Sequence, residues 1–136
     1  MMKDVNKALA RFWSGFGVPA YIDGHVPTKE APDGRSIPVD PPYITFDVRA
    51  SEAFDQESLT AINWHEARNG DSGMAERADL MDRIALAIPP EGTLIALDGG
   101  GFLALYRGPD FQSYYDDPED PNVLGGRTSY QVNYYC

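Results

Sequence analysis

The chain has 136 residues and a mass of 15.0 kDa, with 43% apolar and 12% aromatic residues, which suffices for the core of one domain without a disulfide or metal staple. Its 21 acidic and 11 basic residues give a formal charge of −10, which disfavours a nucleic-acid or membrane binder because phosphates and anionic lipids repel it. One cysteine, Cys136, excludes internal disulfides and cysteine-based metal cages, and without a signal-peptide pattern or long apolar run we expect a cytosolic protein.

The first element that the sequence predicts is a helix over about residues 2–16. Its apolar residues recur at spacings of three and four and form one stripe, and Pro19 follows the glycines that end it. Trp13 on this stripe has two interpretations, a core residue or an aromatic anchor at a subunit contact.

A proline-rich stretch over residues 18–42 follows, with six prolines and no periodicity. Loops of this length are uncommon inside compact domains and are usually functional or partly disordered. We therefore expect a long loop that either orders against a neighbouring molecule or is simply flexible.

The rest of the chain alternates between strand and helix patterns. Residues 43–50 and 59–68 predict two strands of an antiparallel hairpin, and residues 74–88 predict a helix that ends at Pro89. Further strands are predicted at 93–97, at 102–106 and at 127–136.

This order contains no repeating strand–helix unit, which indicates an α+β class. The sequence thus predicts a single domain over residues 1–136, with a mostly antiparallel sheet of about five strands and two helices packed on one face.

No pattern in the chain predicts catalytic, cofactor-binding or metal-binding residues. The glycines after Asp98 precede an apolar extended run instead of a helix, so a hairpin turn explains them better than a phosphate loop does. The acidic run 116–120 contains Pro118, is followed by Pro121, and lacks the central glycine of a calcium loop. His25 and His65 stand apart from any recognised nucleophile motif.

Several short segments, in order along the chain, resemble a known family. They are LARFWSGFGVPAY at 9–21, Val26-Pro27, PYITF at 42–46, Asp98-Gly99-Gly100, RGPDF at 107–111, and Asp116 with Pro118-Glu119-Asp120. Each segment is weak alone, but together they cover most of the chain and resemble the tail terminator proteins of long-tailed bacteriophages, also called minor capsid or tail completion proteins.

The resemblance implies a non-enzymatic virion protein without a cofactor. Its subunits would close into a ring, commonly a hexamer, that caps the tail tube, stops its polymerisation and joins the tail to the head. The implied partners are other copies of the chain, the tail tube protein and the head–tail connector of the neck. DNA would pass through the ring without sequence-specific recognition, no membrane would be involved, and the protein would assemble in the host cytoplasm and reside in the virion neck.

Three other functions stay open from the sequence. A head-completion or head–tail adaptor protein would bind the portal side of the neck instead of the tube. A small cytosolic enzyme would use acids such as Asp98 and Asp116, but few histidine, cysteine and lysine residues lie near any glycine-rich loop. An acidic mimic of nucleic acid would gather its acids on one face, whereas here they are dispersed among all the elements. For the ring-forming function, exposed aromatics and charges beside long loops are the candidates for oligomer or partner contacts. These are Trp13, Tyr21, Tyr114, Tyr115, Asp116, Asp117, Glu119 and Asp120.

Overall fold

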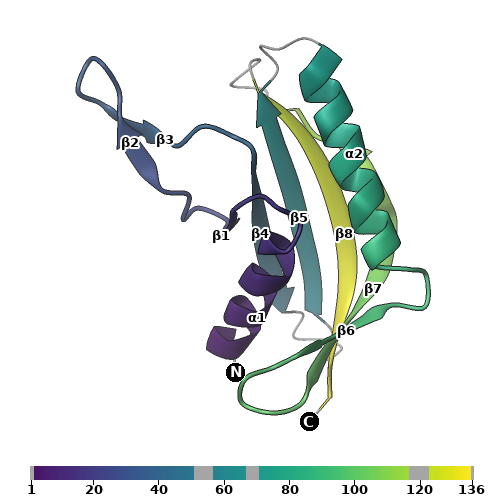
Figure 1. The fold of residues 1–136 in the computed structure, drawn as a ribbon. Helices are drawn as coiled ribbons and strands as arrows, with labels where there is room; N and C mark the ends of the chain where they lie inside the picture. Colours follow the sequence, from purple (N-terminus) through teal and green to yellow (C-terminus); the bar gives the residue numbers. More distant parts are fainter. Residues whose placement is uncertain (1, 51–56, 67–70, 117–122, 136) are drawn as a thin grey trace.

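The computed structural model describes residues 2–50, 57–66, 71–116 and 123–135 (Figure 1). Within them the chain forms an α+β fold in which a large sheet carries two helices on one face. The elements in chain order are α1 (Met2–Ser14), β1 (Ala20–Ile22), β2 (Thr28–Glu30), β3 (Ser36–Pro38), β4 (Tyr43–Ala50), β5 (Glu57–Glu66), α2 (Asp71–Ala87), β6 (Thr93–Ala96), β7 (Phe102–Tyr114) and β8 (Val123–Tyr135).

The main sheet has six strands in the order β1-β4-β5-β8-β7-β6, and β2 and β3 form a separate two-stranded sheet. All neighbours in the main sheet are antiparallel except β1 and β4, which are parallel. The sheet is therefore mixed and has one strand more than the sequence predicts. A parallel pair requires a crossover connection, and the segment from 23 to 42 supplies it.

The core lies between the helices and one face of the sheet. Helix α1 contributes Val5, Leu9 and Trp13, and α2 contributes Leu80 and Ile84, with Ile88 directly after its end. The strands supply every second residue, as the pleat requires: Ile44, Phe46, Leu59, Ala61, Leu103, Leu105, Tyr130 and Val132. Trp13 contacts Tyr130 with a ring-centroid distance of 5.5 Å, so the first helix and the last strand meet at the centre of this core.

Several predicted elements are confirmed. The predicted strand 43–50 coincides with β4, the hairpin with β5 is antiparallel, and both helices lie within a few residues of their predicted bounds. The glycines after Asp98 form the β6–β7 turn, in which Gly100 and Gly101 have φ values of 96° and 83°. These positive angles explain why the turn uses glycine.

Three predictions differ from the structure. Strand β8 begins at Val123 and not at residue 127, because Gly125 and Gly126 have no side chains that could show alternation. The stretch 18–42 is not a structureless loop, because it contains β1, β2 and β3, whose three-residue length is too short to show alternation. Strand β7 runs eight residues beyond the predicted end at 106. An irregularity between Arg107 and Gln112, with Asp110 at φ 49°, interrupts its alternation and hides the continuation.

Candidate functional site: surfaces for self-association

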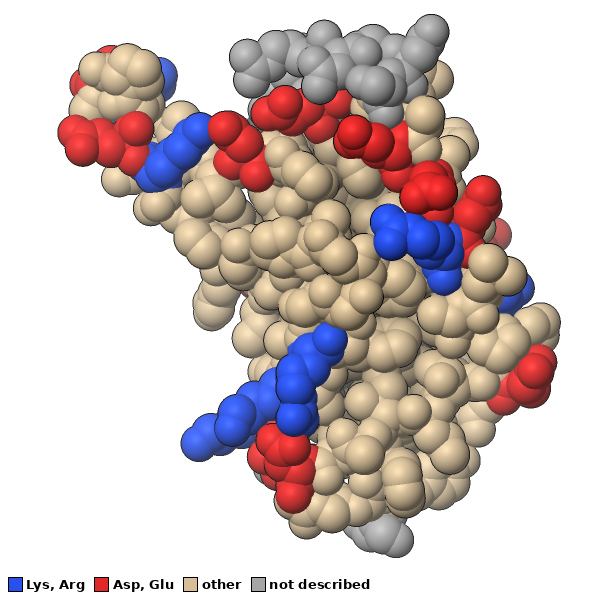
Figure 2. Space-filling view, viewed as in Figure 1, with Lys and Arg blue, Asp and Glu red and all other residues tan. Residues whose placement is uncertain are grey.

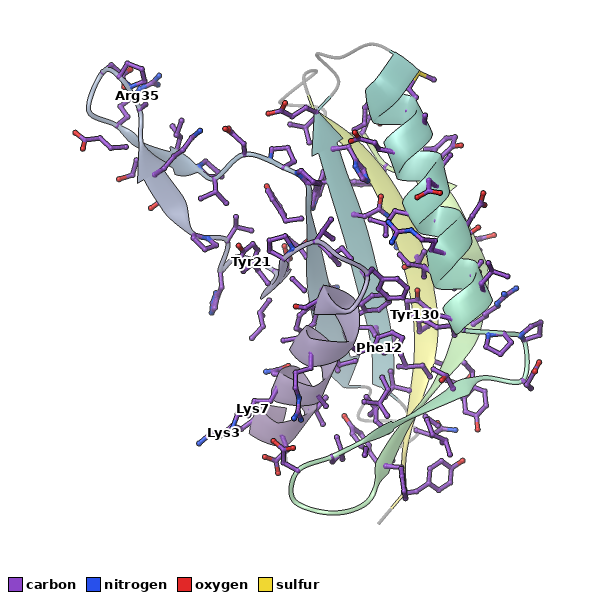
Figure 3. All side chains as sticks on the ribbon, in the orientation of Figure 1. Lys3, Lys7, Phe12, Tyr21, Arg35 and Tyr130 are labelled. Carbon is purple, nitrogen blue, oxygen red and sulfur yellow. The ribbon has the colours of Figure 1, made fainter. Side chains whose placement is uncertain are left out.

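The segment between β1 and β4 carries a projecting hairpin, which we call the arm, residues 27–40. It consists of β2, a turn at Gly34 and β3, and it extends away from the main sheet (Figure 1). Its base is closed by a hydrogen bond from the Val39 N–H to the Pro27 carbonyl and by the Lys29–Asp40 ion pair at 2.6 Å. Figure 3 shows Arg35 at its tip, where it donates to Asp33.

An isolated two-stranded hairpin is marginally stable in water. Every residue of β2 and β3 is exposed except Ile37, which is half-buried. The arm thus has the character of a segment that gains stability by packing against another molecule.

The helices cover one face of the sheet, and the opposite face, which we call the open face, carries mainly polar residues. A cleft of about 410 Å³ lies on it beside β1, β4 and β5. Its charged lining comes from Asp23, Asp47, Arg49 and Arg127. Arg49 donates to Asp47 at 2.8 Å, so two of the four charges already neutralise each other.

An apolar patch lies on the same open face at the other end of the sheet. Leu94 on β6, Phe102 on β7 and Tyr135 on β8 are between 48% and 63% exposed. The register pairs Phe102 with Tyr135 and Leu94 with Ala104, which places the three side chains on the face opposite Leu103 and Leu105. This patch was not predicted, because Leu94 and Ile95 are both apolar and the sequence does not show which of the two faces the core.

Three of the predicted interface residues lie together at the end of β7. Tyr114 and Tyr115 are 64% and 41% exposed, and Asp116 follows them. The guanidinium of Arg77, a buried residue of α2, lies 3.8 Å from the Tyr114 ring centroid and donates to Asp116 Oδ1 at 3.0 Å. Tyr115 packs edge-on against Trp64, with centroids 5.9 Å apart.

These contacts hold the two tyrosines and the carboxylate in fixed positions at the surface. Side chains that are ordered before binding lose less entropy in a complex, so this group is well suited to contact a partner.

The remaining candidates have different positions. Trp13 is fully buried, so it is a core residue and not an aromatic anchor on the surface of the subunit. Tyr21 on β1 is half-buried and packs against Tyr43, with centroids 6.0 Å apart (Figure 3). Asp117, Glu119 and Asp120 lie outside the described residues.

A buried polar cluster lies between α2, β5 and β8. The Asn63 side chain donates to the Gly126 carbonyl at 3.0 Å and is 2.8 Å from His65 Nε2, while Thr128 donates to the Ala61 carbonyl. Burial lowers the pKa of His65, whereas Glu76, with Oε2 3.9 Å from Nδ1, acts in the opposite direction. His65 is therefore a neutral structural residue near pH 7.

The described residues contain no group of three or more histidine, cysteine or acidic side chains that could hold a metal ion. In the same part of the chain, no helix is both long and apolar enough to cross a membrane.

Comparisons with known proteins bear on the fold alone. No protein-family model matches the chain, and no curated protein sequence matches it. A solved structure of another protein matches 99% of this chain and 93% of its own length with a TM-score of 0.56 and 13% identity. At this identity the likeness shows a shared α+β fold.

Proposed function

We propose that this protein is a ring-forming structural subunit of a bacteriophage neck, acting as the tail terminator that caps the tail tube. The observation that carries the proposal is the arm, a hairpin that projects from the core (Figure 1) and whose two strands are exposed except at Ile37. The ordered resemblance of the sequence segments to tail terminators supplies the identity of the assembly.

A ring requires two unlike surfaces on each chain, so that the front of one subunit fits the back of the next. In this proposal the arm is the front surface and reaches the neighbouring subunit. The apolar patch of Leu94, Phe102 and Tyr135 lies elsewhere on the subunit and serves the contact with the tube protein. Exposed aromatic and apolar groups of this kind are typical of the centre of a protein interface.

The function assigned to the ring is mechanical. It occupies the end of the tube, prevents the next tube ring from adding, and presents a docking surface to the connector below the head. The protein would act in the host cytoplasm during assembly and afterwards in the virion neck.

The test is a tube polymerisation assay with the tail tube protein of the same virus. Added to growing tubes, the wild-type chain should shorten the tube-length distribution in electron micrographs and should be found at tube ends. A variant in which Gly-Gly replaces residues 28–38 should lose both effects while keeping its thermal stability. Unchanged tube lengths, together with binding to the connector alone, would instead support the head–tail adaptor.

A further inference from the structure

We propose that neighbouring copies contact each other through opposite charges, with the outward face of α1 in one copy packed against the outward face of α2 in the next. The inference rests on the proposed ring for its setting, but the contact between the two helices is tested separately from the function.

The outward face of α1 carries a basic stripe, defined by Lys3, Lys7 and Arg11. Their spacing of four residues places them on one line along the helix, opposite the buried Val5 and Leu9. All three are exposed, and Figure 2 shows basic side chains gathered over α1. Figure 3 places Lys3 and Lys7 near the N-terminus of this helix.

The basic stripe keeps a surplus of positive charge. Arg11 pairs with Asp98 at 2.8 Å, and Arg11, with a smaller contribution from Lys7, lowers the pKa of that carboxyl. Asp4, in the first turn of α1, lies on the same side, so two acids against three bases leave about one positive charge for a partner.

The outward face of α2 carries an acidic stripe, defined by Glu76, Asp79 and Asp82. All three are exposed on the side away from the buried Leu80 and Ile84, and Figure 2 shows acidic side chains over this helix with basic ones among them. Arg83 pairs with Asp79 at 3.2 Å and leaves a surplus of about two negative charges.

An apolar residue extends the acidic stripe. Leu86 follows Asp82 by one helical turn and is 83% exposed. It offers apolar area to a partner beside the charges.

The two stripes match in length as well as in charge. A rise of 1.5 Å per residue gives the basic stripe a span of about 12 Å and the acidic stripe about 9 Å. Both lie on the face of the sheet that carries the helices (Figure 1), and among the described residues no ion pair joins one stripe to the other within one chain. In a head-to-tail arrangement, each contact joins a basic stripe to an acidic stripe, and the repeated contact closes a ring when the rotation between subunits allows it.

The binding partner that we favour for the basic stripe is a second copy of the chain, not DNA. A chain of charge −10 carries its own acidic stripe beside the basic one, so a phosphate backbone approaching α1 also meets the repulsion of α2.

The test uses two charge reversals that avoid the existing Arg11–Asp98 pair. The variant K3E/K7E makes the α1 stripe acidic, and D79K/D82K makes the α2 stripe basic. Native mass spectrometry, with and without tail tube protein, measures assembly of each variant, of a 1:1 mixture and of the chain with all four changes. The control R49E/R127E makes the same change in net charge as K3E/K7E but on the open face.

Each reversal alone should weaken assembly by about tenfold or more, since like charges then face each other. The mixture and the four-fold variant should recover it, because every contact again joins opposite charges. The control should assemble like the wild type. If the assembled species is a dimer, and it is lost in each reversal and recovered in the mixture and in the four-fold variant, the helix contact is supported and the ring is not.

Three results would overturn the contact. They are normal assembly of K3E/K7E, a mixture of folded variants that stays unassembled, and wild-type binding of a short DNA duplex that K3E/K7E loses.

Discussion

Arg107 caps the C-terminal end of α2, and its hydrogen bonds allow the contribution of this contact to the stability of the fold to be worked out. It extends from β7 to the C-terminal end of α2, where Nε donates to the Ile88 carbonyl at 2.7 Å and Nη2 donates to the Ala85 carbonyl at 2.8 Å. Its guanidinium also lies 4.6 Å from the Phe111 ring centroid. The last carbonyls of a helix lack intrahelical donors and carry the negative end of the dipole, so a cation here is favourable.

The variant R107M keeps the apolar stem and removes the charge and the donors. Two charge-assisted hydrogen bonds at a partly exposed site contribute about 1 kcal/mol each, with about 0.5 kcal/mol each from the dipole and the aromatic ring. We expect a loss of about 3 kcal/mol, or about 10 °C in Tm for a domain of this size. R107K should lose about half as much, because an ammonium keeps the charge but not the planar fork.

Urea unfolding followed by circular dichroism measures these changes. The matched control is R83M, which removes an exposed i,i+4 pair with Asp79 and one hydrogen bond to the Phe16 carbonyl and should cost about 0.5 kcal/mol. If R107M unfolds within 0.5 kcal/mol of the wild type, Arg107 is not a cap for α2 and the reasoning is wrong.

Three further predictions concern His65 in the buried polar cluster, the arm, and Gly126 on β8. Because the folded state lowers the pKa of His65, the unfolded state takes up a proton first as the pH falls below about 6.5, so stability should decrease there, and H65Q should have a shallower loss between pH 7.5 and pH 5 in thermal scans. Replacing residues 28–38 with Gly-Gly should leave Tm within about 3 °C of the wild type but abolish assembly on sizing columns; a large drop in Tm would mean that the arm supports the subunit core. The G126A variant places a Cβ 2.7 Å from Met81 Sδ and 2.9 Å from the Asn63 amide, which should cost about 1–3 kcal/mol in denaturant unfolding, and a neutral result would mean that α2 moves away freely.

The sequence was most informative where one physical signal dominated. Alternation of Ile44, Phe46 and Val48 with polar residues predicted β4 and its buried face, since burial on one side of a strand requires a period of two. The helices were equally clear, because their core residues keep the helical spacing and Pro89 follows the second.

The sequence failed where structure depends on contacts between distant residues. Strand β1 is too short to show a pattern. It forms because its backbone pairs with that of β4, which follows it in the sequence only after the arm. The continuation of β7 depends on pairing with β8 beyond an irregularity that includes Asp110. Both pairings join residues that are distant in the sequence, so no short segment of the chain predicts them.

The candidate surfaces show the same limit. Helical spacing places Trp13 on the stripe of α1 but does not say whether that stripe meets the sheet or a second subunit. The exposure of Tyr114 and the patch around Phe102 depend on which face the helices cover, and that follows from the packing of the whole core.

The central claim is that this chain closes into a ring, and its mass in solution tests this most directly. Native mass spectrometry of the purified protein, alone and with the tail tube protein of the same virus, should show one discrete multiple of 15.0 kDa, with six copies expected from the resemblance to tail terminators. A chain that stays at 15.0 kDa in both conditions, at concentrations up to about 100 μM, would contradict the account.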